Sequence, residues 1–293
     1  GNAMIISLIF APGDSEKKMT KASEGDADVV ILDLEDSVSE SRKVIARGMV
    51  TEFLKVKSKE AKPKLYVRVN PLDTEYCLSD IADVVTGAPA GILLPKCNSG
   101  SDIQKLSSYL DILEVANGYP KDSIEIIAVA TETAASVFNM GSYENCSVRL
   151  NGITWGAEDL GAAVRASTSL TSTKDWTSPY QMVRSLCLFG AYAANIEALD
   201  TVMADFRDTS QLAIVCDQAR KDGFTGKLAI HPCQVDIINQ AFTPTKEEIE
   251  HSRAVLALFE ENPDAGTLQL DGKMIDKPHI EQAKKILDGI KNL

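Results

Sequence analysis

The chain of 293 residues lacks the cysteine and histidine patterns of a zinc site. Its six cysteines include no CxxC pair, and its three histidines are dispersed along the sequence. The usual zinc sites take their ligands from short, regular spacings of these two residue types. We therefore expect no zinc centre, and we interpret the cysteines as reduced thiols of a cytoplasmic protein.

Positive charge and long apolar runs are also scarce. The 30 basic residues are outnumbered by 42 acidic ones, which gives a net charge of −12. This balance argues against nucleic acid and anionic membranes as partners, and any anionic ligand would need a local basic pocket. No stretch approaches the roughly 20 apolar residues of a membrane span, and we find no basic segment followed by an apolar run that would indicate a secretory signal.

What the sequence does contain is a regular alternation of short apolar runs with segments of helical periodicity. In the helix expected over Asp102–Ala116, for example, Ile103, Leu106, Leu110 and Leu113 share one face, and a second helix is expected over Gln181–Asn195. The hydrophobic content of 44% is enough for a large core. The apolar runs predict eight strands: Ile5–Phe10, Val29–Leu34, Leu65–Val69, Gly91–Leu94, Ile124–Ala130, Leu150–Trp155, Ala198–Met203 and Lys227–Ile230.

Eight strands that alternate with helices over roughly 240 residues are typical of a (β/α)₈ barrel. The alternative is an open, doubly wound sheet. Many proteins of that kind carry a glycine-rich phosphate turn after the first strand, and nothing here resembles one. The sequence therefore favours an α/β fold with a (β/α)₈ TIM barrel.

Polar residues follow most of the predicted strands. In a barrel they would gather at the carboxyl ends of the strands, where active sites are built. Two of them, Glu132 and Asp159, could converge, and paired carboxylates suit a hard cation such as Mg²⁺. The full set is Asp14, Asp33, Glu35, Asp36, Arg68, Asn70, Lys96, Glu132, Glu158, Asp159 and His231.

The alternation stops beyond Phe242, where a different unit begins. Thr245-Lys-Glu-Glu248 is a capping box for a helix through about Glu261, a hairpin is expected about Asp271-Gly272, and Pro278 starts a last helix. We predict a catalytic barrel over 1–243 and a lid or oligomerisation segment over 244–293. This segment covers a barrel mouth, its own or that of a neighbouring subunit, or else it packs against the outer helices.

Eight motifs, in order along nearly the whole chain, resemble the citrate lyase beta subunit-like branch of the HpcH/HpaI aldolase family. Eight collinear motifs are far more specific than any single one. They are Phe10-Ala-Pro-Gly-Asp14, Val30-Ile-Leu-Asp-Leu-Glu-Asp-Ser37, Val67-Arg-Val-Asn-Pro71, Gly91-Ile-Leu-Leu-Pro-Lys96, Thr131-Glu-Thr-Ala134, Trp155-Gly-Ala-Glu-Asp-Leu160, Gly223-Phe-Thr-Gly-Lys-Leu-Ala-Ile-His-Pro232 and Leu270-Asp-Gly-Lys-Met-Ile-Asp276.

The resemblance implies a Mg²⁺-dependent lyase, with Mn²⁺ as an alternative metal, that cleaves or forms a carbon–carbon bond in a β-hydroxyacyl-coenzyme A thioester. Malyl-, citramalyl- and citryl-CoA are examples of such substrates. By this resemblance Glu132 and Asp159 are the metal ligands, and Arg68 binds the thioester oxygen. Glu35 and Asp36 match acidic residues that hold metal-bound waters.

The same resemblance implies that Asp276 is the catalytic acid or base, delivered in relatives by the adjacent subunit of a trimer. We expect a homotrimer or a hexamer. The retro-Claisen reaction places negative charge on the departing enolate, and a fixed cation such as Arg68 would stabilise it. The backbone amides from Ala157 through Glu158 to Asp159 could hold the substrate carboxylate.

Each of these assignments has a structural alternative. Glu132 could cap the next helix, Arg68 could be only an ion-pair partner of Glu35 or Asp36, and Asp276 could cap the last helix. His231 is better explained as a core or turn-stabilising residue, and Lys96 is as apt to pair with a rim carboxylate as to touch substrate.

Two other functions remain open alongside the lyase. A relative could act on free 2-oxo acids or hydrolyse the thioester with the same metal site, or the chain could be a non-catalytic or carrier-dependent subunit. The loop from Ala166 to Pro179 is rich in Ser and Thr and lacks the glycines expected there. Because this loop falls near the mouth, we expect that acyl or CoA specificity has drifted.

Overall fold

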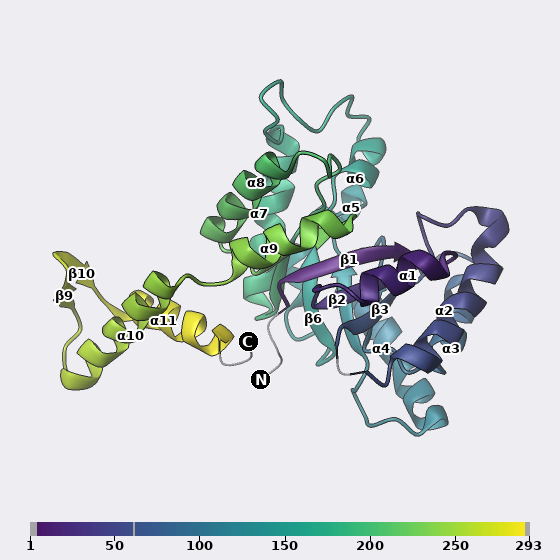
Figure 1. Cartoon of the computed structure of the whole chain (residues 1–293), viewed down its shortest axis with the longest axis horizontal. Helices are drawn as coiled ribbons and strands as arrows, with labels where there is room; N and C mark the ends of the chain where they lie inside the picture. The colour runs from purple at the N-terminus through teal and green to yellow at the C-terminus, as the bar shows by residue number, and fades with distance from the viewer. Residues whose placement is uncertain (1–4, 61, 291–293) are drawn as a thin grey trace.

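The computed structural model describes residues 5–60 and 62–290, and its centre is a closed barrel of parallel strands (Figure 1). Neighbouring strands pair in sequence order, and β1 pairs with β8 to close the ring. The strands are β1 (Ser7–Pro12), β2 (Val29–Asp33), β3 (Lys64–Arg68), β4 (Gly91–Leu94), β5 (Glu125–Val129), β6 (Leu150–Thr154), β7 (Glu197–Asp200) and β8 (Gly226–Ala229).

Helices follow the strands and form the outer layer of the barrel. The expected helices over Asp102–Ala116 and Gln181–Asn195 are confirmed as α4 and α7. The helices of this layer are α1 (Glu16–Ser23), α2 (Lys43–Lys57), α3 (Cys77–Val85), α4 (Gly100–Asn117), α5 (Ala134–Val137), α6 (Glu158–Ala163), α7 (Ser178–Ala193), α8 (Thr209–Asp222) and α9 (Val235–Phe242), with single 3₁₀ turns at Glu40–Arg42, Met140–Tyr143 and Pro232–Gln234.

The strands are buried on both faces, as a parallel sheet covered by helices requires. In β2, Val29 and Ile31 belong to the cluster inside the barrel, while Val30 and Leu32 pack in the larger cluster that includes side chains of the surrounding helices. All five residues of this strand are buried. The prediction of a (β/α)₈ barrel is therefore confirmed, and the closing pair of β1 with β8 rules out the open sheet.

The ends of β1 and β7 differ from the expected positions by two or three residues, and the ends of the other strands agree to within one residue. β1 begins at Ser7 and continues to Pro12, and β7 ends at Asp200 instead of Met203. Beyond Asp200 the carbonyl groups are bound by side chains: Thr201 O accepts from Lys227 Nζ at 2.6 Å, and Met203 O accepts from Gln234 Nε2 at 3.0 Å. The apolar residues after Asp200 therefore form a loop instead of continuing the strand.

The last part of the chain forms α10 (Lys246–Glu261), the hairpin of β9 (Leu268–Leu270) and β10 (Lys273–Ile275), and α11 (Lys277–Ile290). Thr245 caps α10 through Glu248 N, as the capping box predicts. Asp271 and Gly272 both have positive φ, at 49° and 78°, as the turn of a two-residue hairpin requires. A small separate core around Val255, Ile275 and Ala283 holds these elements together.

We call residues 244–290 the C-terminal arm. It leaves the barrel from the end at which the strands begin, because Asn239 in the preceding helix binds Ser7 Oγ and Asp26 O. Its contacts with the barrel include an ion pair from Glu248 to Arg220 and the placement of Lys285 Nζ over the ring of Tyr192, 5.1 Å from its centroid. In Figure 1 the arm extends away from the barrel.

The position of the arm contradicts the expectation that it covers the mouth of its own barrel. The carboxyl ends of the strands, which form the mouth, lie at the opposite end of the barrel, so the arm does not cover the mouth of its own chain. That it covers the mouth of a neighbouring subunit stays a prediction. Within the described residues, no helix has the length and apolar character needed to cross a membrane.

Candidate active site

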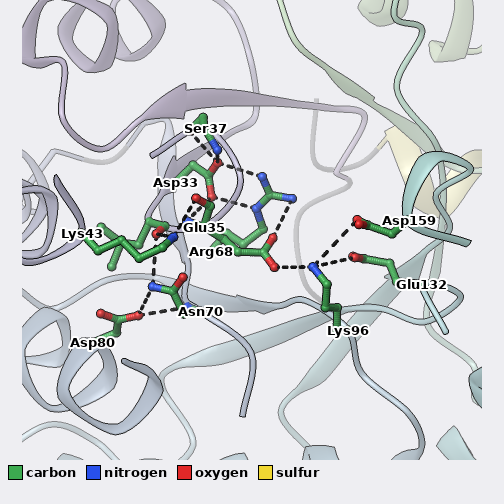
Figure 2. Close-up of polar contacts among 11 residues, drawn as sticks. Asp33, Glu35, Ser37, Lys43, Arg68, Asn70, Asp80, Lys96, Glu132 and Asp159 are labelled. Atoms are coloured by element: carbon green, nitrogen blue, oxygen red, sulfur yellow. Dashed lines mark hydrogen bonds and ion pairs between the residues drawn. The ribbon is translucent and has the colours of Figure 1, made fainter. Parts of the chain in front are cut away.

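Charged side chains from successive strand ends converge at the mouth of the barrel (Figure 2). Asp33 ends β2 and Arg68 ends β3, and the two residues are also register partners across these strands. Lys96 follows β4, Glu132 follows β5, and Asp159 lies in the first turn of α6, which follows β6. The sequence places all five at the rim, and the structure shows that they form one connected network.

Arg68 is held rigidly by Asp33. Its Nε and Nη2 each donate to one carboxylate oxygen of Asp33 at 2.8 Å, and the guanidinium lies 4.6 Å from the centroid of the Phe10 ring. Ser37 donates to Asp33 through both its backbone N and its Oγ, at 3.0 and 2.6 Å. Burial by itself would raise the pKa of Asp33, but the charge and hydrogen bonds of Arg68 outweigh it and lower that pKa. The pair therefore stays ionised and fixes the guanidinium in place.

Glu35 connects this pair to Lys96. Its Oε2 accepts from Lys96 Nζ at 2.7 Å, and its Oε1 lies 3.5 Å from Arg68 Nη1. Burial raises the pKa of Glu35, against the opposing effects of the two cations. The backbone of Lys96 has φ of 49°, in the left-handed region that residues other than glycine rarely adopt. This conformation is part of the turn that carries the ammonium into the network.

Glu132 and Asp159 lie on the other side of Lys96. The ammonium nitrogen is 3.6 Å from Glu132 Oε2 and 3.9 Å from Asp159 Oδ2. Among the described residues, Glu132 Oε2 is a buried atom with no hydrogen-bond partner. Burial, the adjacent Asp159 carboxyl group and the charge of Glu35 together raise the pKa of Glu132 to about 8.

This pair has the properties of a cation site. Two carboxylates lie side by side and point toward Lys96 (Figure 2). Glu132 is 6% exposed, and Lys96 does not compensate the charge of the pair fully. Oxygen ligands of this kind match the preference of a hard divalent cation. The donor set therefore fits a metal such as Mg²⁺.

Local structure decides one of the alternatives left open by the sequence. The helix after Glu132, α5, is capped by Thr133, whose side chain accepts from Ser136 N. Thr133 Oγ1 in turn donates to Asn98 Oδ1 at 2.6 Å. Glu132 is therefore not the cap of this helix, and its carboxylate is free to point into the mouth beside Lys96 (Figure 2).

Several predicted residues lie apart from the network. Asp276 precedes α11 in the C-terminal arm, where its Oδ1 lies 2.8 Å from His279 Nδ1. Asp36 follows Glu35 but is exposed. Ala157 is the N-cap residue of α6 and is buried, and Glu158, between it and Asp159, is exposed. His231 caps the 3₁₀ turn after β8 and stacks on Phe206, which confirms the turn-stabilising interpretation.

The main partner of Arg68 was not identified from the sequence. The alternative interpretation of Arg68 named Glu35 or Asp36 as its ion-pair partner. Glu35 Oε1 does lie 3.5 Å from Arg68 Nη1, but the bidentate contact is to Asp33. The available signal was that Asp33 and Arg68 each end a strand, on strands that are neighbours in a barrel. Their pairing depends on the strand register, which the apolar pattern does not specify.

Comparison with known proteins places this geometry in context. The sequence profile described as HpcH/HpaI aldolase/citrate lyase matches residues 6–232. A second profile, described as C-C_Bond_Lyase of the TIM-Barrel fold, matches residues 189–291 and so extends through the C-terminal arm.

Named relatives match over nearly the full length. The chain is 30% identical over 290 residues to a (3S)-malyl-CoA thioesterase of Cereibacter sphaeroides, covering 96% of this chain and 93% of the relative. It is 31% identical over 289 residues to the citrate lyase subunit beta of Escherichia coli, covering 96% and 91%. A crystal structure of CitE from Mycobacterium tuberculosis in complex with magnesium, acetoacetate and coenzyme A superimposes with a TM-score of 0.79, 28% identity and 99% of both chains covered.

Proposed function

Because the chain belongs to the HpcH/HpaI aldolase/citrate lyase family, we propose that it is a Mg²⁺-dependent carbon–carbon lyase for a β-hydroxyacyl-CoA. Malyl-, citramalyl- and citryl-CoA are the candidate substrates, and the reaction is a retro-Claisen cleavage or its reverse. The observation that carries the proposal is the carboxylate pair of Glu132 and Asp159, which Lys96 and Glu35 join to the rigidly held Arg68 guanidinium.

Glu132 and Asp159 would hold the metal, with Mn²⁺ as an alternative to Mg²⁺. The buried Glu132 Oε2, which has no hydrogen-bond partner, supports this assignment, and the CitE of Mycobacterium tuberculosis was crystallised with magnesium. Mg²⁺ held by these two residues would supply Lewis-acid polarisation of a 2-oxo acid. Glu35 and Asp36 would accept hydrogen bonds from water molecules around the metal.

Arg68 would bind the thioester oxygen and stabilise the enolate that forms when the carbon–carbon bond breaks. Asp33 and Phe10 hold the guanidinium in place before substrate arrives, so little reorganisation is needed as the charge develops. The charge and hydrogen bonds of Arg68 lower the pKa of Asp33 against the effect of burial, so the pair stays charged. Arg68 is thus both a substrate-binding and a catalytic residue.

The two remaining roles fall on the start of α6 and on the C-terminal arm. The amides of Ala157, Glu158 and Asp159 lie at the start of α6, where N–H groups have no partner within the helix, and would hold the substrate carboxylate. Asp276 would transfer the proton of the β-hydroxyl group or of the enolate. Because the arm points away from its own barrel, Asp276 would act at the site of a neighbouring subunit in a homotrimer or hexamer.

A second outcome at the same site is hydrolysis of the thioester. The relative from Cereibacter sphaeroides is named a (3S)-malyl-CoA thioesterase, which favours this alternative over cleavage of free 2-oxo acids. The relatives named citrate lyase subunit beta support a carrier-dependent variant of the lyase. The proposal includes a cytoplasmic location, in keeping with cysteines that are all free thiols.

The test is to incubate the purified chain with malyl-, citramalyl- and citryl-CoA, with Mg²⁺ or with EDTA, and to identify the products by mass spectrometry. We expect a 2-oxo acid and an acyl-CoA to form from at least one substrate in Mg²⁺ only. Glu132→Gln should lower the rate by at least about 100-fold, because one metal ligand is lost. Glu197→Gln is the matched control, since Glu197 lies at the start of β7, at the opposite end of the barrel.

The products separate the alternatives. Free CoA with an intact hydroxy acid would establish the thioesterase. If the chain turned over none of the thioesters but cleaved free 2-oxo acids in Mg²⁺, it would be an aldolase. Equal activity of the wild type and Glu132→Gln would overturn the proposed metal site.

A further inference from the structure

A cavity of about 320 Å³ lies next to the carboxylate pair. Two of its lining residues, Ala157 and Glu158, immediately precede Asp159 in the chain. On its other sides the cavity is bounded by the loop after β7, by α8 and by a loop that follows α6. The cavity therefore shares with the site the segment at the start of α6, whose backbone amides the proposed function already uses.

The walls of the cavity are mainly apolar. Leu170 and Trp176 come from the loop after α6, Val202 and Met203 from the loop after β7, and Val215 from α8. None of these five side chains is fully buried in the core. The cavity thus leaves apolar surface that an apolar ligand could cover, with a gain of free energy in proportion to the area removed from water.

Both lysines that line the cavity are already paired, Lys174 with Asp208 and Lys227 with Asp200. Lys227 is buried, and its Nζ donates to Asp200 Oδ2 at 2.8 Å and to Thr201 O at 2.6 Å. The other oxygen of Asp200 accepts from Trp155 Nε1 at 2.9 Å. Because both charges are paired, the cavity does not require an anionic occupant.

The outer wall is a short, ordered flap formed by residues 168–177. Leu170 and Trp176 form an antiparallel bridge, and Thr177 N donates to Ser169 O at 2.9 Å. Lys174 pairs with Asp208, the residue that caps α8, at 3.2 Å. Trp176 packs edge-on against the buried Trp155, with ring centroids 4.9 Å apart. These contacts hold the flap against the start of α8 and against Trp155, which follows β6. The cavity therefore has a defined outer wall.

We propose that this cavity binds an alkyl side chain on the 2-oxo acid half of the substrate. The inference rests on the proposed function, which places that half beside the metal held by Glu132 and Asp159, with its carboxylate on the amides at the start of α6. The side chain would extend from there past Ala157 and Glu158 between Val202 and Trp176. The volume corresponds to roughly ten water-sized groups, so the substrate class is a hydroxyacyl thioester whose 2-oxo acid product carries a chain of several carbons.

The test compares the binding of pyruvate, 2-oxobutanoate, 2-oxohexanoate and 2-oxooctanoate to the full chain in Mg²⁺ by isothermal titration calorimetry. We expect the affinity to rise up to about fourfold for each added methylene until the cavity is filled, in line with the transfer of a methylene from water. Val215→Trp should fill the cavity and remove this gain while leaving the affinity for pyruvate unchanged.

Ile214→Trp is the matched control, because Ile214 precedes Val215 on the same helix and its side chain is 63% exposed. This variant should keep the wild-type dependence on chain length. A gain that survives in Val215→Trp would show that the alkyl chain lies elsewhere and would overturn the inference. Comparable melting temperatures of the two variants would show that both fold.

The outcomes also separate this inference from the function on which it rests. If pyruvate binding needs Mg²⁺ and Glu132 but the affinity does not rise with chain length, the inference about the cavity is overturned and the lyase proposal stands. A chain-length gain that Val215→Trp removes, but that needs neither Mg²⁺ nor Glu132, would support the cavity and count against the metal site. Absence of binding by all four acids would overturn both.

Discussion

Lys96 lies where the carboxylates of three different segments meet. Its ammonium contacts Glu35 at 2.7 Å and approaches Glu132 and Asp159 at 3.6 and 3.9 Å. Its positive φ is a conformation that non-glycine residues keep only where the surroundings enforce it. Lys96 thus provides the positive charge that partly offsets the acidic pair.

Replacement of Lys96 by Met should make the chain more dependent on a divalent cation for stability. Loss of the ammonium leaves Glu35 and Glu132 buried with less compensation, and we expect unfolding to become easier by about 1–3 kcal/mol in EDTA. Added Mg²⁺ should then raise the melting temperature of Lys96→Met more than that of the wild type. Differential scanning fluorimetry in EDTA and in Mg²⁺ measures both effects.

Lys55→Met serves as the control for this experiment, because Lys55 pairs with Glu52 on the exposed surface of α2. Its response to Mg²⁺ should match that of the wild type. If Lys96→Met and the wild type gain equal stability from Mg²⁺, the cation does not bind beside Lys96.

Single residues of the site could be predicted where their position directly after a strand was enough to place them at the mouth of the barrel. Glu132 and Asp159 follow apolar runs, and the barrel pattern alone places them on one rim. The Asp33–Arg68 pair could not be predicted, because a one-residue change in register would separate the two side chains. The contact of Lys96 with three carboxylates depends on a left-handed backbone that no local sequence signal indicated.

At the scale of elements, a buried ion-pair network joins α4 to the start of β6. Arg149, which precedes β6, is fully buried and donates to Glu114 and Asp111 of α4. Asp122 is a further partner, at 3.4 Å. These three acidic residues lie close enough together to hold a metal, with ligand atoms within 4.8 Å of one another, but the guanidinium of Arg149 lies among them. The cluster is therefore a structural connection at the end of the barrel where the strands begin.

This network should make the free energy of unfolding depend on pH in the acidic range. Burial would raise the pKa of Glu114, but its hydrogen bonds with Arg149 and with backbone amides outweigh burial and lower the pKa from 4.5 to about 2. A lowered folded-state pKa stabilises the fold above pH 4.5, and this stabilisation is lost as the pH falls toward 2. It amounts to about 2–3 kcal/mol.

Glu114→Gln should therefore be less stable than the wild type at pH 7, and the difference should shrink between pH 4.5 and pH 2. Urea denaturation followed by circular dichroism across this range measures it. Glu52→Gln, which changes an exposed carboxylate of α2, should show no such trend. A constant difference between Glu114→Gln and the wild type at all pH values would contradict the pKa shift.

The C-terminal elements were well predicted because their signals are local. The capping box at Thr245 and the Asp271-Gly272 turn each act over a few residues, and both appear in the structure as expected. The placement of the arm depends instead on contacts distant in sequence, such as Glu248 with Arg220. For this reason the sequence did not reveal at which end of the barrel the arm leaves.

At the scale of the whole molecule, the arm sets a requirement for activity. Asp276 lies in the arm, beyond the end of the barrel at which the strands begin, while Glu132 lies at the mouth. If Asp276 is catalytic, each site is completed by two chains. Glu132→Gln and Asp276→Asn should then both be inactive alone and should complement each other when they are co-expressed.

In random mixed trimers, about a quarter of the sites would combine an intact Glu132 with an intact Asp276 of the neighbour. We therefore expect co-expression to restore about a quarter of the wild-type rate. Co-expression of Glu132→Gln with the double variant that carries both changes should restore no activity. A co-expressed pair of single variants that stays inactive would indicate that Asp276 does not act in the neighbouring subunit.

The overall architecture could be predicted because the alternation of apolar runs and helical segments is repeated eight times. Each run supplied a strand, and errors at the ends of β1 and β7 did not affect their order. Closure of the sheet was expected from the number of strands. The cavity beside Asp159 was not foreseen, because it depends on how the flap packs against α8.

The pairing that closes the barrel also has a consequence for synthesis on the ribosome. Ser7 in β1 pairs with Lys227 in β8, so the partner of the first strand emerges 220 positions later. At typical translation rates this delay is on the order of 10–40 s. During that time one edge of β1 has no strand to pair with, and such edges readily associate with other chains. The nascent chain should therefore engage holding chaperones until β8 has left the exit tunnel.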